Sequence, residues 1–129
     1  MVKLQLHKIH EDDRGAIFLI KGDLKEHEEI TLFTTKKGLA RGGCIHKKND
    51  EHCVVLEGKI IYYIGEAIKS NAGLLCDKGD SVLIPKNTPH YFIAFEDSLV
   101  MEWGATPEEK LEKHKETREI VEEINEKTI

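Results

Sequence analysis

The sequence predicts an all-β fold, a barrel or a sandwich, followed by one C-terminal helix. Short apolar or alternating runs, broken by Gly, Asp, Asn or Lys, fill about the first hundred residues, and this spacing is typical of small β-domains. The end of the chain is rich in Glu and Lys and lacks that alternation. The length of 129 residues fits one domain, with a barrel over 1–105 and a helical segment over 106–129.

About ten runs have strand character. In chain order they are Lys3–Ile9, Gly15–Ile20, Glu29–Thr34, Leu39–Ile45, Glu51–Leu56, Lys59–Ile64, Gly73–Cys76, Ser81–Ile84, His90–Phe95 and Ser98–Trp103. Glu57-Gly58 separates two of these runs and predicts a tight hairpin turn. The large side chains that alternate on the strands are expected in the core: Tyr62, Tyr63, Phe92, Met101 and Trp103. Cys53 and Cys76 are expected there as well.

The C-terminal helix has a clear predicted start. Thr106 is a suitable N-cap, Pro107 suits the first helical position, and Glu109 lies three residues after the cap. The helix should run to Lys127, with a narrow apolar stripe of Leu111, Val121 and Ile124. That stripe should pack on the barrel or on a second subunit.

Composition narrows the function classes. The formal net charge is -5, so the chain lacks the positive field that binding to a phosphate backbone needs, and nucleic acid is not an expected partner. No apolar run approaches the roughly 20 residues of a membrane helix, and the first residues do not resemble a signal peptide. The three cysteines form no CxxC pair, which favours a reducing compartment, and we expect a cytoplasmic protein.

Four residues form a candidate site. Cys44 and His46 are two apart, so in a strand they point to the same side. Glu51 opens the next strand after a short polar loop, and an antiparallel return can place it opposite His46. His90 again heads a strand after a turn bounded by proline.

The spacing of these residues resembles the cupin superfamily, including its RmlC-like members. In the first cupin motif, Gly38, His46, Glu51 and Gly58 stand at matching intervals. In the second motif, the matching residues are Gly79, Pro85 and His90.

Three positions depart from the cupin pattern. Cys44 replaces a histidine, Asn87 replaces a glycine, and Ala94 replaces an asparagine. Asn87 is a mild change because Asn tolerates the left-handed conformation. Cys44 is the larger change, because it stands at a metal-ligand position of the motif.

The resemblance implies a single-domain double-stranded β-helix, or jelly-roll barrel, with a divalent metal inside. His46, Glu51 and His90 would be metal ligands, and Cys44 offers a thiol in the fourth position. Such a set suits Zn, Fe, Mn, Ni or Cu, with a thiolate favouring the softer ions. Cys44 can instead be a small apolar residue that fills the barrel.

A finer resemblance is to cupins that isomerise or epimerise nucleotide-linked sugars. It is carried by Asp12-Asp13-Arg14-Gly15 and by Arg41-Gly42 before His46. It implies metal-free chemistry in which His46 is a catalytic base and Arg41 contacts the sugar or the diphosphate.

Three functions therefore stay open. The first is a metal-dependent cupin enzyme acting on a small polar, carbohydrate-like substrate. The second is a metal-free sugar-nucleotide isomerase or epimerase, and the third is a module that binds a small ligand without turnover. The resemblance also implies a homodimer in which an N-terminal strand such as Lys3–Ile9 pairs between subunits.

Overall fold

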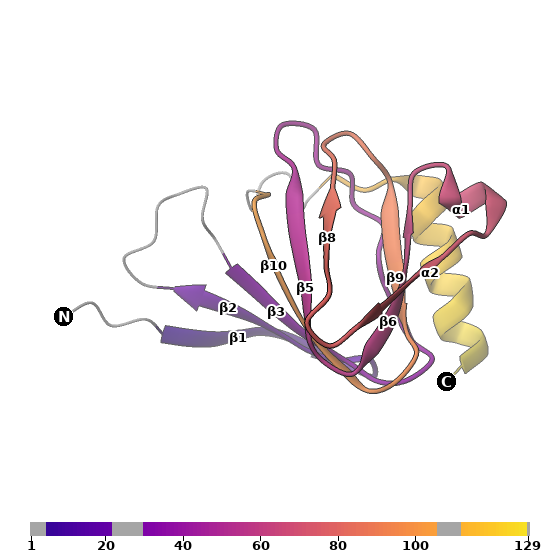
Figure 1. Cartoon of the computed structure of the whole chain (residues 1–129). Helices are drawn as coiled ribbons and strands as arrows, with labels where there is room; N and C mark the ends of the chain where they lie inside the picture. Colours follow the sequence, from indigo (N-terminus) through magenta and orange to yellow (C-terminus); the bar gives the residue numbers. More distant parts are fainter. Residues whose placement is uncertain (1–4, 22–29, 106–111, 129) are drawn as a thin grey trace.

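A computed structural model of the chain describes residues 5–21, 30–105 and 112–128, and it shows two antiparallel sheets (Figure 1). The six-stranded sheet has the order β1-β2-β3-β10-β5-β8, and the four-stranded sheet has the order β4-β9-β6-β7. The elements are β1 (Gln5–Asp12), β2 (Gly15–Lys21), β3 (Ile30–Thr35), β4 (Ala40–Gly42), β5 (Glu51–Glu57), β6 (Lys59–Ile64), α1 (Ala67–Ser70), β7 (Leu74–Asp77), β8 (Ser81–Ile84), β9 (His90–Ala94), β10 (Ser98–Trp103) and α2 (Lys115–Thr128). The predicted all-β class with a C-terminal helix is confirmed, and the short helix α1 was not predicted.

The main core lies between the two sheets and consists of side chains that alternate along the strands. On β5 this alternation buries Cys53 and Val55, and it places the carboxylate of Glu51 inside the barrel with them. The remaining members of the core cluster are Ile60, Tyr62, Cys76, Ile84, Phe92 and Val100. The predicted core positions of Cys53, Cys76, Tyr62 and Phe92 are confirmed.

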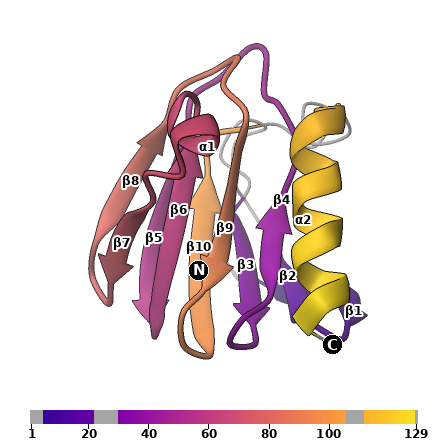
Figure 2. The same ribbon diagram turned by 90° about the vertical axis from the view of Figure 1, so that its right-hand side faces the viewer.

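The helix α2 packs on the outer side of the four-stranded sheet, against β4 and β9 (Figure 2). Val121 is buried against Ala40 and Tyr91, with Tyr63, Ile120 and Ile124 beside them. The side chain of Asn125 extends the sheet edge, because it accepts a hydrogen bond from the Ala40 N–H at 2.7 Å and donates one to the Ala40 carbonyl at 3.1 Å. The predicted apolar stripe therefore packs on the barrel of its own chain.

The helix begins later than the sequence predicts. Residues 112–114 are not helical, because they lie beside 43–45 and form a β-bridge between Lys113 and Cys44. The His114 N–H donates to the Gly43 carbonyl at 2.7 Å, and a helical bond runs from the Arg118 N–H to the His114 carbonyl at 2.9 Å. The expected cap at 106–109 and Leu111 lie outside the described residues.

Glu57-Gly58 does not close a hairpin, and this prediction is wrong. The strand β5 pairs with β10 and β8, whereas β6 pairs with β7 and β9. The turn therefore carries the chain from one sheet to the other. Gly58 has φ +84°, and a Cβ there would collide with the carbonyl oxygen of Asp97, so this corner requires glycine.

The predicted strand Leu39–Ile45 is reduced to Ala40–Gly42. Gly42 and Gly43 have φ values of +133° and +103°, which end the regular extended backbone. A Cβ on Gly42 would lie 2.7 Å from the His90 carbonyl oxygen, so the chain passes close to β9 here. The close approach brings the segment that carries His46 next to the start of β9.

Among the described residues, no helix has the length and apolar character needed to span a membrane.

Candidate metal centre

Three side chains from distant parts of the sequence meet inside the barrel. His46 follows the short strand β4, Glu51 begins β5, and His90 begins β9. All three are buried, and each offers a ligand atom within 4.8 Å of the others. The structure brings the three predicted residues together, whereas metal ligation by them stays a prediction.

The orientation of His90 is fixed by a backbone contact. Its Nδ1 lies 2.9 Å from the Thr88 carbonyl oxygen, which can only accept a hydrogen bond. Nδ1 therefore carries the proton, and Nε2 presents its lone pair toward Glu51 Oε1, 4.0 Å away. Burial lowers the pKa of His90, which favours the neutral ring that a metal ligand requires.

The two distances from Glu51 to the histidines fit a shared ion better than direct hydrogen bonds. Glu51 Oε1 is 3.8 Å from His46 Nδ1 and 4.0 Å from His90 Nε2, both longer than a hydrogen bond. Two atoms that each lie about 2.1 Å from one ion are at most about 4.2 Å apart, so both Glu51 distances are within this limit, whereas the group as a whole spans up to 4.8 Å. Two imidazoles and one carboxylate are also a ligand set that Zn and other transition metals accept. The residues present therefore fit a divalent metal.

Cys44 lies close to this group without belonging to it. It lines the same cavity as His46, but its sulfur is not among the atoms that converge within the described part of the chain. Burial raises the pKa of the Cys44 thiol, which favours the protonated form. All three cysteines are free thiols.

A cavity of about 350 Å³ opens next to the three residues. Tyr62 and Phe92 form part of its wall, and the Tyr62 hydroxyl donates a hydrogen bond to Glu102 Oε2 at 3.3 Å. Burial raises the pKa of Tyr62 well above its ordinary value, so the hydroxyl keeps its proton. The cavity thus combines apolar walls with donors and acceptors, as small-molecule sites commonly do.

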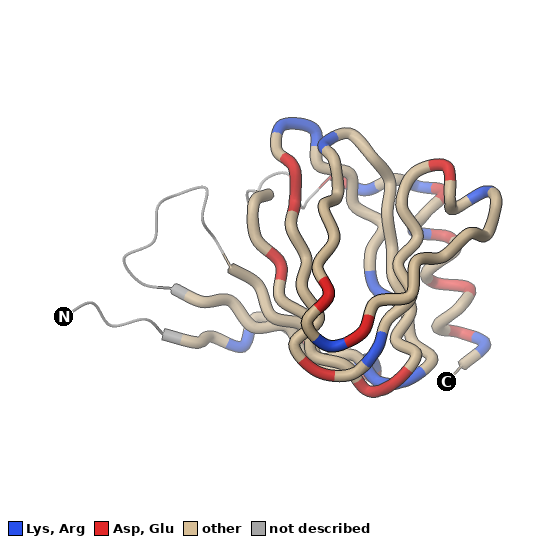
Figure 3. Tube along the Cα trace, in the orientation of Figure 1, with Lys and Arg blue, Asp and Glu red and all other residues tan. Residues whose placement is uncertain are grey.

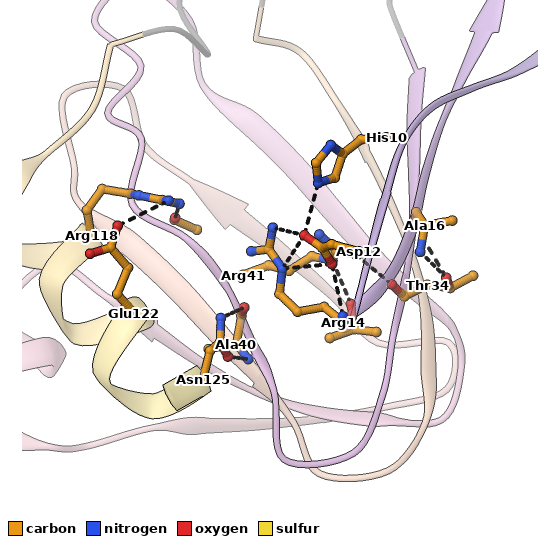
Figure 4. Close-up of polar contacts among 12 residues, drawn as sticks. His10, Asp12, Arg14, Ala16, Thr34, Ala40, Arg41, Arg118, Glu122 and Asn125 are labelled. Carbon is orange, nitrogen blue, oxygen red and sulfur yellow. Dashed lines mark hydrogen bonds and ion pairs between the residues drawn. The ribbon is translucent and has the colours of Figure 1, made fainter. Parts of the chain in front are cut away.

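Three arginines also line the cavity: Arg14, Arg41 and Arg118. The buried Arg41 donates from Nε to Thr35 Oγ1 at 3.0 Å and from Nη2 to the Thr34 carbonyl at 2.9 Å. Burial lowers the pKa of Arg41 to about 10, so it remains charged at neutral pH. Figure 4 shows Arg41 and Arg14 near Asp12, with Arg118 on α2. Guanidinium groups at a cavity wall favour an anionic or hydroxyl-rich ligand, although Arg14 and Arg118 are also paired with Asp12 and Glu122.

The segment Asp12-Asp13-Arg14-Gly15 forms the turn between β1 and β2 rather than part of one strand. Arg14 Nη2 contacts Asp12 Oδ2 at 2.6 Å, and this contact holds the pKa of Asp12 well below its usual range. An open groove of about 470 Å³ lies between this turn and α2, and it shares Arg14 and Arg118 with the cavity.

The sequence did not point to Glu102 or Arg118, and it assigned Tyr62 only to the core. In the structure Glu102 shares strand parity with Ser98 and Val100, and all three side chains are buried. Arg118 could not be assigned, since its place at the cavity depends on how α2 packs. The expectation that Met101 and Trp103 lie in the core is wrong, because the parity of β10 turns them to its outer side.

The fold and the site together define a small β-barrel protein with a candidate metal centre beside a polar cavity. No protein-family model matches the sequence, and no curated protein matches it with significance. Solved structures do resemble it. An RmlC-like cupin protein from Desulfovibrio desulfuricans has a TM-score of 0.61 and 27% identity, covering 75% of this chain and 88% of that one.

Two further structures share the fold. KdgF from Halomonas sp. has a TM-score of 0.63 and 15% identity, covering 81% of this chain and 89% of that one. The capsular polysaccharide assembling protein CapF from Staphylococcus aureus has a TM-score of 0.62 and 19% identity, covering 78% of this chain. The match spans only 28% of the CapF chain. The present chain has the RmlC-like cupin fold.

Proposed function

We propose that this protein binds one divalent transition metal through His46, Glu51 and His90 and acts on a small polar, carbohydrate-like molecule in the adjoining cavity. The observation that carries the proposal is the convergence of two imidazoles and a carboxylate, all buried, within 4.8 Å. A buried carboxylate needs a cation or strong hydrogen bonds to offset its desolvation. A divalent ion held by Glu51 and the two histidines would supply that charge.

The chain's own residues prepare the site. The Thr88 carbonyl orients the His90 ring and fixes its tautomer, which is the role of outer contacts around a metal ligand. A bound divalent ion would act as a Lewis acid on an oxygen of the ligand. Arg41, held by Thr35 and Thr34, would orient an anionic or hydroxylated group of the same molecule.

The substrate class rests on the cavity. Its volume of about 350 Å³ suits a small molecule, and the arginines and Glu102 offer charged donors and an acceptor. The structural neighbour CapF is a capsular polysaccharide assembling protein, which agrees with a carbohydrate-like ligand.

A metal-free sugar-nucleotide isomerase or epimerase is the second candidate. It is favoured by Tyr62, whose ring lies 6.3 Å from that of His90 and which lines the cavity together with Glu102. In this case His46 would take a proton next to a keto group, and Arg41 would hold the substrate. A module that binds without turnover would use the same cavity.

Metal analysis tests the first proposal. Protein without a His tag is stripped with a chelator, incubated with Zn, Mn, Fe, Ni or Cu, and freed of unbound ion. We expect one equivalent of at least one ion per chain, lost in His90→Asn and kept in the matched control His52→Asn, whose exposed side chain lies outside the barrel. If the wild type retains no ion, the metal proposal is wrong. A thermal shift with UDP- or dTDP-sugars in ion-free protein would then favour the second candidate.

A further inference from the structure

Two loops lie side by side at the end of the barrel that carries the candidate metal centre. The loop 43–50 links β4 to β5 and contains His46, and the loop 85–89 links β8 to β9 and precedes His90 (Figure 1). Both loops contain basic residues, which Figure 3 shows in blue at this end. Because like charges repel, other contacts hold the two loops together.

Residues 86–88, which we call the β8–β9 turn, contact both histidines. The Asn87 N–H donates to the His46 carbonyl oxygen at 2.5 Å. The carbonyl oxygen of the next residue, Thr88, accepts the hydrogen bond from His90 Nδ1 at 2.9 Å. The position of this turn therefore affects where both imidazole rings lie.

Asp50 fixes the start of the β8–β9 turn. The strand β8 ends at Ile84, and Pro85 has no N–H, so the Lys86 N–H is the first backbone donor beyond the strand. Asp50 Oδ1 accepts a hydrogen bond from this N–H at 2.8 Å. The backbone of Asp50 is closely packed in turn, since a Cβ on Gly104 would collide with the Asp50 carbonyl oxygen. The Asp50 carboxylate thus connects the two loops directly.

We propose that Asp50 is a positioning residue of the metal centre, an inference that rests on the metal binding proposed above. Asp50 is not among the converging ligand atoms of the described residues. Its carboxylate holds the β8–β9 turn, and the turn holds the backbone of His46 and the ring of His90. Outer contacts of this kind change metal affinity by about 10- to 100-fold, because they orient the ligands before the ion binds.

Titration of the full ion-free chain with Zn²⁺, in competition with a chelating dye, measures the effect on affinity. We expect Asp50→Ala to raise the Kd for Zn²⁺ about tenfold. Asp50→Asn removes the same charge but keeps Oδ1 as an acceptor, so its Kd should stay close to that of the wild type. Equal weakening in the two variants would show that the charge of Asp50 matters rather than its hydrogen bond, and would overturn the inference.

Asp97→Ala is the matched control. Asp97 is exposed like Asp50, and its Oδ1 accepts a hydrogen bond from the Lys37 N–H at the same distance of 2.8 Å, at the opposite end of the barrel (Figure 1). Each alanine variant loses one bond from an aspartate to a backbone N–H, so the ion-free forms should lose similar stability. Only Asp50→Ala should lose affinity for Zn²⁺. If Asp97→Ala raises the Kd equally, a general loss of stability explains the effect and the inference is wrong.

The tautomer of His90 provides a readout that needs no metal. At neutral pH, ¹H–¹⁵N correlation spectra of the ion-free wild type and of Asp97→Ala should show the Nδ1–H form of His90. Asp50→Ala should show both tautomers, because the Thr88 carbonyl is no longer held in place. Asp50→Leu, which also lacks an acceptor, replaces Asp50→Ala if the latter does not fold.

These spectra separate failure of the inference from failure of the proposed function. If the wild type retains no ion, the proposed metal binding is wrong, and the His90 tautomer still tests the role of Asp50. A single, unchanged Nδ1–H form in the variant without an acceptor at position 50 overturns the inference in either case.

Discussion

Replacing Glu51 by Gln should weaken metal binding without lowering the stability of the ion-free barrel. The substitution keeps the shape of the side chain and removes its charge. Glu51 is 1% exposed, so the ion-free wild type buries a carboxylate that an amide would replace at lower desolvation cost. The ion-free variant should therefore unfold at the same temperature as the wild type or higher. Its response to metal should nearly vanish, because a neutral amide is a poor ligand for these ions.

The magnitude follows from linkage between binding and folding. At an ion concentration of about 100 Kd, binding stabilises the wild type by about 2.7 kcal/mol. For a chain of 129 residues this corresponds to a rise in Tm of about 10 °C, at about 4 °C per kcal/mol. If the substitution weakens binding about 100-fold, the same ion concentration contributes only about 0.4 kcal/mol, or about 2 °C.

Differential scanning calorimetry measures the Tm of the ion-free protein and the rise in Tm that the ion causes. The exposed neighbour in sequence, His52→Asn, serves as the control and should respond like the wild type. If Glu51→Gln keeps the full metal-dependent rise in Tm, the Glu51 carboxylate does not hold the ion.

Three further predictions concern pH and packing. Burial lowers the pKa of His90 below its ordinary value of 6.5, so below about pH 6.5 the unfolded chain binds more protons than the folded chain. The free energy of unfolding of the ion-free protein should therefore decrease as the pH falls through this range. Urea unfolding at several pH values should show a weaker dependence on pH for His90→Asn than for the wild type. Gly58→Ala should lower the free energy of unfolding by about 3 kcal/mol, because the new Cβ would collide with the Asp97 carbonyl oxygen. The control Gly79→Ala has φ +92° but open space around the new Cβ, so it should lower the free energy of unfolding by only about 1 kcal/mol. Equal losses in the two variants would contradict this explanation. Val121→Ala should lower the free energy of unfolding in urea by about 1–3 kcal/mol, since Val121 is buried between α2 and the sheet. An unchanged free energy of unfolding would show that α2 does not stabilise the barrel.

Local spacing predicted much of the fold and the site. Turn residues and strand periodicity located the ten strands to within a few residues, although β4 is much shorter than expected. The intervals between His46, Glu51 and His90 resemble those of the cupin motifs, and this resemblance identified the three side chains that meet. Asn87 has φ +63°, as expected for an asparagine in place of glycine.

Features that depend on tertiary contacts were not accessible from the sequence. Hydropathy places Trp103 inside and Glu102 outside, but the register of β10 reverses this arrangement. Whether Glu57-Gly58 closes a hairpin depends on which strands the flanking segments choose as partners. The start of α2 depends on a bridge between Cys44 and Lys113, which are far apart in the chain.

Anomalous diffraction from crystals soaked in the ion that binds best would locate the metal itself. We predict one anomalous peak enclosed by a ring nitrogen of His46, Glu51 Oε1 and His90 Nε2. A peak elsewhere on the molecule, with none among these three side chains, would show that they do not form a metal centre.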